Sequence, residues 1–161
     1  MGDAVTIWIV EDVDDDALDA WAAVETLRGS WSTPVRVCWT PSFHWYPPLR
    51  MGVGDHAPLE EISHYPDIVI LDLCLRTPKG EELRGDVMYQ KLREWETHKT
   101  CGGPAFVIFW SLHQGRKDTD RFVRHIVESD ARVIPLASKR PELLKETLAN
   151  LWRRVIEERE K

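Results

Sequence analysis

The stretch Ile68-Val69-Ile70-Leu71-Asp72 places four consecutive aliphatic residues directly before a carboxylate. Aliphatic runs without polar alternation are typical of strands that are covered on both faces, as in the centre of a parallel sheet. In such sheets ligands bind beyond the carboxyl ends of the strands, where the loops diverge. The stretch therefore predicts a central strand that presents Asp72 at the ligand-binding edge.

Four other short apolar runs read as strands of the same sheet, at Val5–Val10, Val35–Trp39, Ala105–Trp110 and Val133–Leu136. Pro135 lacks an N–H for the ladder, so we place the last of these strands at an edge or at a bulge. Stretches with the spacing of amphipathic helices alternate with the strands, and this alternation predicts an α/β fold with helices on both faces of the sheet.

Helical spacing of apolar residues marks the expected helices. In the first helix, Leu18, Trp21, Ala22 and Leu27 form the apolar side and Gly29 ends it. A short turn is expected at Leu59–His64. The remaining helices are marked by three groups: Leu83, Val87, Met88, Leu92 and Trp95; then Phe122, Val123, Ile126 and Val127; then Leu144, Leu148, Leu151, Trp152, Val155 and Ile156.

An irregular insertion of about 41–58 separates the second strand from the central one. Its prolines exclude a continuous helix or central strand, and a loop of this length is unusual without a use. Aromatic residues gather at its start: Trp39, Phe43, Trp45 and Tyr46. They either pack over the edge of the sheet or form a surface that recognises a partner.

Composition narrows the class of protein. The 161 residues, which include an expected final helix of about 142–159, suit one domain spanning 1–161. A net charge of -6 without long basic runs argues against direct nucleic-acid binding, and the apolar runs are too short to span a membrane. The N-terminus lacks the pattern of a signal peptide. Cys38, Cys74 and Cys101 suggest no disulfide framework, so we expect reduced thiols and a cytoplasmic protein.

Polar residues follow the strands in an order that points to phosphate chemistry. Glu11 and Asp12 follow the first strand, Asp72 the third, Ser111 the fourth and Lys139 the fifth. Three carboxylates brought close together repel one another unless a cation lies among them, and oxygen ligands favour Mg²⁺. A hydroxyl and an ammonium nearby suit phosphoryl transfer, for which Asp72 is the natural nucleophile.

The order ED, PDIVILDL, FVIFWS and a Lys after the fifth strand resembles the receiver domain of response regulators in two-component signalling. The resemblance implies a doubly wound, flavodoxin-like, five-stranded parallel sheet flanked by five helices. It also implies that Asp72 accepts a phosphoryl group from a histidine kinase or phosphotransfer protein. Mg²⁺ would be held by Asp72, Asp12 and the carbonyl of Cys74, with Glu11 holding a metal-bound water. Ser111 and Lys139 would bind phosphoryl oxygens.

Several positions differ from the family pattern, and one further position matches it. Gly80 stands where the family's glycine opens the third helix. Arg76 replaces the usual proline after the phosphoacceptor, with Pro78 two residues later, and the bulk of Leu112 narrows the approach of a donor. Arg140 competes with Lys139 for the phosphate-pairing position; the single flexible ammonium favours Lys139. Leu136 stands nearest to the family's aromatic switch residue.

Other interpretations of the same residues are weaker. Asp14, Asp15 and Asp16 lack the glycine and glutamate of a calcium loop, so we expect them to cap the first helix. A haloacid-dehalogenase phosphatase needs a second Asp where Cys74 stands. His113 reads as an exposed loop residue, although it could flank the phosphoryl site. The other histidines of the irregular region have no metal-binding spacing.

The leading hypothesis is therefore a stand-alone phosphorylation switch, with no conventional enzymatic activity beyond phosphoryl transfer to Asp72 and its hydrolysis. It would act on a downstream effector protein, through a face formed by the last helices and strand that also suits a homodimer. The alternative is a receiver-like interaction module that is not phosphorylated. The switch hypothesis requires Asp72 to lie close to residues 11 and 12 and to be open to solvent.

Overall fold

The computed structural model of the protein describes residues 4–11, 13–40, 49–50, 65–76, 82–97, 103–111, 117–136 and 138–161. The helices are α1 (Asp14–Arg28), α2 (Gly85–Glu96), α3 (Lys117–Ser129) and α4 (Pro141–Arg159). The strands are β1 (Val5–Val10), β2 (Val35–Thr40), β3 (Leu49–Arg50), β4 (Ile68–Leu71), β5 (Cys74–Arg76), β6 (Glu82–Arg84), β7 (Phe106–Phe109) and β8 (Val133–Pro135). In these ranges no helix is both long and apolar enough to cross a membrane.

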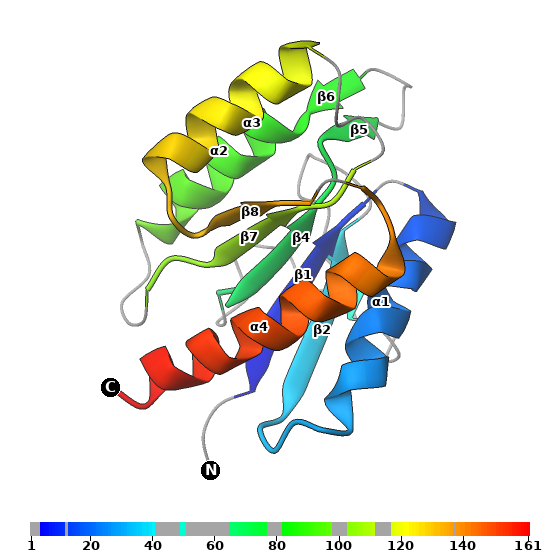
Figure 1. Ribbon diagram of the computed structural model, residues 1–161, viewed down its shortest axis with the longest axis vertical. Helices are drawn as coiled ribbons and strands as arrows, with labels where there is room; N and C mark the ends of the chain where they lie inside the picture. The colour runs from blue at the N-terminus through cyan, green and yellow to red at the C-terminus, as the bar shows by residue number, and fades with distance from the viewer. Residues whose placement is uncertain are drawn as a thin grey trace.

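The main sheet has the strand order β3-β2-β1-β4-β7-β8. Its last five strands run parallel, and β3 pairs with β2 in the antiparallel direction (Figure 1). The parallel order is that of a doubly wound flavodoxin-like fold, as the sequence predicts. Pro135 ends the edge strand β8, where its missing N–H interrupts little of the ladder.

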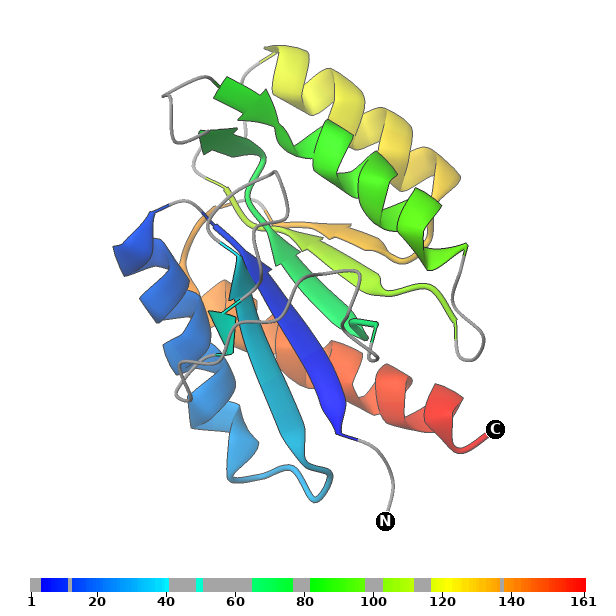
Figure 2. The ribbon, with the colours of Figure 1, turned by 180° about the vertical axis from the view of Figure 1, so that it is seen from behind.

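Both faces of the sheet are covered, which explains the unbroken aliphatic runs. In β1, Val5, Ile7 and Ile9 belong to the core under α1 and α4, whereas Trp8 and Val10 belong to the core under α2 and α3. The same alternation holds along β4 and β7. α4 crosses in front of the strands in Figure 1 and behind them in Figure 2.

The predicted apolar side of α1 is partly wrong. Leu18 is 49% exposed, and the residues that pack fully against the sheet are Ala17, Ala20, Ala23 and Val24. Trp21 and Leu27 are only partly buried at the margin of this core. The side of the helix that packs on the sheet therefore carries mainly small side chains, and the positions of the large apolar residues did not predict it.

The apolar stripes of the last two helices are confirmed. In α3 the predicted residues pack in the core under α2 and α3; they are Phe122, Val123, Ile126 and Val127. In α4 the fully buried residues are Leu144, Leu148, Leu151 and Val155, while Trp152 stacks on Trp31 with ring centroids 3.9 Å apart.

The predicted helix start at Leu83 is wrong. Leu83 lies in β6, which pairs with β5 in a small antiparallel sheet directly after Asp72, and α2 begins only at Gly85. Gly80 lies outside the described residues. Met88 and Leu92 of α2 are buried as predicted.

The insertion contributes to the edge of the sheet. Leu49 pairs with Trp39, so the chain returns from the insertion to lie beside β2. The aromatic residues Phe43, Trp45 and Tyr46 lie outside the described residues, as does the expected turn at 59–64. The described part of the chain accordingly contains four of the five expected helices.

Candidate functional site at the carboxyl edge of the sheet

Backbone hydrogen bonds continue past the strands and hold their last residues side by side. The amide of Asp72 donates to the carbonyl of Val10 at 3.0 Å, and that of Trp110 donates to the carbonyl of Leu71 at 3.0 Å. These bonds bring the residues that follow β1, β4 and β7 to one edge. Glu11, Asp72 and Ser111 are all buried there, with exposed fractions of 2%, 5% and 1%.

Lys139, which follows β8, sends its ammonium into this group of acids. Its Nζ lies 2.6 Å from Oε2 of Glu11 and 3.6 Å from Oδ2 of Asp72. The ammonium also stands 5.2 Å from the ring centroid of Trp110, within the range of a cation–π contact. Arg140 is instead the exposed N-cap residue of α4. Of the two candidates, Lys139 is the one placed beside Asp72.

A third acid, Asp16, also binds Lys139. Its Oδ2 lies 2.8 Å from Nζ, and the Asp16 side chain is 26% exposed. The prediction that the acids at 14–16 cap α1 is wrong for Asp16. The N-cap residue is Val13, which makes no side-chain cap, and its N–H donates to Oε1 of Glu11 at 3.1 Å. Asp16 points instead toward a partner 123 residues away in the chain.

The electrostatics follow from three carboxylates around one ammonium. Burial, together with the charge of Asp72, raises the pKa of Glu11 to about 9, even though Lys139 opposes the shift. Burial alone would lower the pKa of Lys139, but the charges and hydrogen bonds of Asp72, Asp16 and Glu11 raise it. Lys139 is therefore charged at neutral pH, whereas Glu11 holds a proton there in the metal-free protein.

Asp12 and the carbonyl of Cys74 are two of the expected metal ligands. Asp12 lies outside the described residues, and Cys74 is the first residue of β5, paired with Arg84. Within the described ranges, no three His, Cys, Asp or Glu side chains are grouped so that they could hold a metal. The side-chain oxygens of Glu11 and Asp72 both lie at this edge, where each contacts the ammonium of Lys139.

The switch hypothesis requires Asp72 to lie close to residues 11 and 12 and to be open to solvent. The first condition holds for Glu11, because the ammonium of Lys139 lies 2.6 Å from Glu11 and 3.6 Å from Asp72; Asp12 lies outside the described residues. The second condition fails in this conformation, since the side chain of Asp72 is only 6% exposed. Leu112, His113 and Pro78 lie outside the described residues.

Two contacts of the site do not follow from the sequence pattern. Trp39, assigned to an aromatic patch, donates its Nε1–H to the carbonyl of Glu11 at 2.8 Å and packs against the core under α1 and α4. Asp16 was missed because helix capping explained it locally. A carboxylate one turn after the acidic pair was the available signal.

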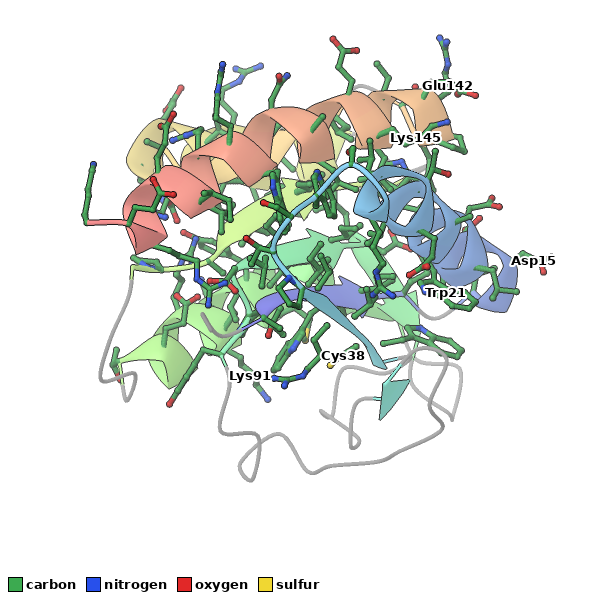
Figure 3. All side chains as sticks on the ribbon, turned by 90° about the horizontal axis from the view of Figure 1, so that it is seen from below. Asp15, Trp21, Cys38, Lys91, Glu142 and Lys145 are labelled. Atoms are coloured by element: carbon green, nitrogen blue, oxygen red, sulfur yellow. The ribbon has the colours of Figure 1, made fainter. Side chains whose placement is uncertain are left out.

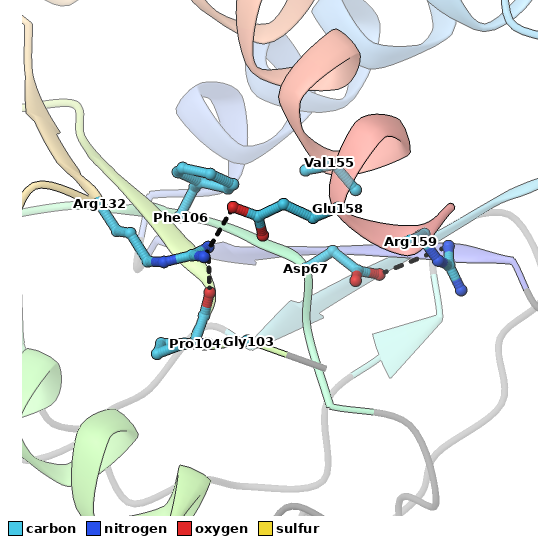
Figure 4. Close-up of a pocket in the computed structure, with 8 residues that line it drawn as sticks. All are labelled: Asp67, Gly103, Pro104, Phe106, Arg132, Val155, Glu158 and Arg159. Carbon is cyan, nitrogen blue, oxygen red and sulfur yellow. Dashed lines mark hydrogen bonds and ion pairs between the residues drawn. The ribbon is translucent and has the colours of Figure 1, made fainter. Parts of the chain in front are cut away.

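A shallow pocket lies far from this site, at the amino end of the strands (Figure 4). Its charged groups are paired: Arg132 binds Glu158 at 2.7 Å, and Arg159 lies 3.9 Å from Asp67. Asp67 also accepts the backbone N–H of Thr6 at 2.8 Å. These contacts tie α4 to the start of the sheet, which is a structural role.

No protein-family model matches the chain, and no curated protein matches its sequence. Two solved structures share its architecture. One is described as the yeast Spc42 trimeric coiled coil, amino acids 181–211, fused to another structure; it has a TM-score of 0.58 and 16% identity, and the match covers 96% of this chain and 82% of that one. The other is the bacteriophytochrome response regulator AtBRR, with a TM-score of 0.50, 14% identity and coverage of 98% and 93%.

These likenesses concern the fold. A coiled-coil segment is a single helix and cannot match a parallel sheet over 96% of this chain, so the first likeness involves the fused part and carries nothing about oligomeric state. The second likeness shows that this chain and a response regulator share a fold. The protein therefore has the doubly wound, flavodoxin-like architecture that a response regulator also has.

Proposed function

We propose that this protein is a phosphorylation-dependent signalling switch that accepts a phosphoryl group on Asp72 from a histidine kinase or phosphotransfer protein. The observation that carries the proposal is the meeting of Glu11, Asp72 and Lys139 from three strand ends, with contacts of 2.6 and 3.6 Å to one ammonium. Ser111 is buried at the same edge. A downstream effector protein would read the switch, and a homodimer through the last helices and strand is part of the same proposal.

The chemistry needs a nucleophilic oxygen and compensation of charge. An oxygen of Asp72 attacks the phosphorus, the P–N bond of the donor breaks, and the imidazole nitrogen keeps the electron pair and takes up a proton. Lys139, already beside Asp72, pairs with a phosphoryl oxygen, and the Ser111 hydroxyl donates to another. Mg²⁺, held by Asp12, Asp72 and the Cys74 carbonyl with Glu11 binding a metal-bound water, would neutralise the charge that develops on the phosphoryl oxygens.

Charge counting supports a dication at this edge. Glu11, Asp16 and Asp72 carry three negative charges when ionised, and Lys139 carries one positive charge. With all three ionised, two negative charges would remain uncompensated, so a bound dication would favour release of the proton that Glu11 holds in the metal-free protein. The ion would compete with Lys139 for the oxygens of Glu11 and Asp72, so the ammonium has to shift when the site fills.

The test measures a covalent product and a conformational signal. Incubation with Mg²⁺ and phosphoramidate, a small P–N donor, should add one phosphoryl group by intact-protein mass spectrometry. Mg²⁺ followed by beryllofluoride should change the tryptophan fluorescence, because Trp110 contacts Lys139. Asp72→Asn should abolish both responses, and Trp110→Phe should remove most of the fluorescence change.

Asp19→Asn is the matched control, since Asp19 is an exposed carboxylate of α1, and it should behave as the wild type. If the wild type gains no phosphoryl group and responds to neither probe, the switch is excluded. A phosphorylation-independent interaction module would then be the better account.

A further inference from the structure

We propose that Asp16 is a positioning residue that holds Lys139 in the resting state and thereby opposes the binding of a phosphoryl group at Asp72. This inference rests on the proposed function and concerns its regulation. Its basis is the contact of 2.8 Å between Asp16 Oδ2 and Lys139 Nζ, the ammonium that also lies 3.6 Å from Asp72 Oδ2. Asp16 lies on α1, whereas the other members of the cluster follow strand ends.

Lys139 is confined on several sides. The side chain of Lys139 is only 5% exposed, and its ammonium contacts Glu11 at 2.6 Å and Asp16 at 2.8 Å. The distance to Asp72 is longer, 3.6 Å. In the resting protein the ammonium is thus closer to two other carboxylates than to the proposed phosphoacceptor. To pair with a phosphoryl oxygen it must weaken at least one of these contacts.

Asp16 should act on an anion and on a cation in opposite directions. A phosphoryl group competes with Asp16 for the ammonium and is repelled by its charge, so loss of the carboxylate favours the anion for two reasons. A metal ion gains from the negative charge of Asp16. It also gains because the ammonium that it displaces from Glu11 and Asp72 keeps Asp16 as a partner. Loss of the carboxylate therefore disfavours the cation.

Asp16→Asn tests this prediction with two titrations followed by tryptophan fluorescence. With Mg²⁺ at saturation, we expect the apparent dissociation constant for beryllofluoride to fall about three- to tenfold, the effect of one partly exposed charged contact. In the absence of beryllofluoride, the dissociation constant for Mg²⁺ should rise about two- to fivefold. Asp16→Glu keeps the charge and should stay closer to the wild type.

Asp15→Asn provides the matched control. Asp15 is the preceding residue of the same helix, is exposed, and points away from the sheet into solvent (Figure 3). Its substitution removes the same formal charge without touching Lys139, so both dissociation constants should change less than twofold. Far-UV circular dichroism and thermal unfolding of each variant establish that the fold is retained.

The outcomes separate the inference from the proposed function. If the wild type responds to both probes and Asp16→Asn matches Asp15→Asn, Asp16 does not restrain Lys139 and the inference is wrong. Shifts of both constants in the same direction also overturn it, because a general loss of stability acts in that way. If the wild type responds to neither probe, it is the proposed function that fails.

Discussion

The metal-free protein should lose stability as the pH rises from about 5 to about 9, and Glu11→Gln should remove much of this dependence. Burial and the charge of Asp72 raise the pKa of Glu11 from 4.5 to about 9. Between these values the native state holds a proton that the unfolded state has released. The free energy of unfolding therefore falls with pH, by at most about 1.4 kcal/mol per pH unit for one proton.

Urea unfolding in the presence of EDTA at several pH values between 5 and 9 measures this slope. The variant matters because other groups also contribute to the pH dependence of stability, and the difference between wild type and Glu11→Gln isolates the carboxyl group. Below pH 4.5 the stabilising contribution is fully present, and it is lost as the pH approaches 9. Parallel curves for the two proteins would show that Glu11 ionises normally.

Saturating Mg²⁺ should reduce the same slope. A bound cation favours the ionised form of a carboxyl group beside it, so the ion favours the charged form of Glu11 and releases the proton that Glu11 holds. The affinity for Mg²⁺ should rise with pH over the interval in which the metal-free protein becomes less stable. Glu11→Gln again serves as the comparison, since it has no proton to release at this position.

Arg93→Met should lower the free energy of unfolding by about 3 kcal/mol. Arg93 binds Glu96 at 2.7 Å and Asp130 at 3.0 Å, and it donates to the carbonyl of Ala105 at 2.9 Å. The side chain of Glu96 is only 6% exposed. Removing the guanidinium leaves the buried carboxylate of Glu96 without its cation, and this accounts for most of the expected loss in the free energy of unfolding.

Arg93 belongs to a network of ion pairs and hydrogen bonds that connects three segments of the chain. Glu96 also accepts the N–H of Ala105 at 2.8 Å, and Asp130 also accepts hydrogen bonds from Tyr89 and from the amide of Arg132. The network thus joins α2 to the start of β7 and to the end of α3. Arg124→Met, at an exposed position of α3, should cost less than about 0.5 kcal/mol in the same urea experiment. A loss below about 1 kcal/mol for Arg93→Met would show that the network is dispensable.

The sequence predicts the parallel sheet because its strands are buried on both faces. Ile68–Leu71 and Ala105–Trp110 have no polar alternation, and only a sheet covered by helices on both sides accommodates such runs. The order of acids, hydroxyl and lysine after these strands also predicts that they share one edge. The structure places Glu11, Asp72, Ser111 and Lys139 there.

Local patterns failed where a distant partner decides the outcome. Leu83 has helical spacing with Val87, yet it pairs in β6 with Leu75 of β5. Leu18 is larger than Ala17, yet the geometry of packing on the sheet buries Ala17 and exposes Leu18. Strand pairing and the rotation of a helix on a sheet are set by contacts remote in the chain, which propensity and spacing do not contain.

The sequence by itself determined the α/β class, the parallel strands and the set of strand ends that meet, because these follow from the period and length of apolar runs. Only the tertiary structure decided that Asp16 binds Lys139, that Trp39 holds the carbonyl of Glu11, and that Asp72 is almost covered. Each of these depends on the distance between atoms from elements far apart in the chain, and such distances arise only when helices and strands have packed.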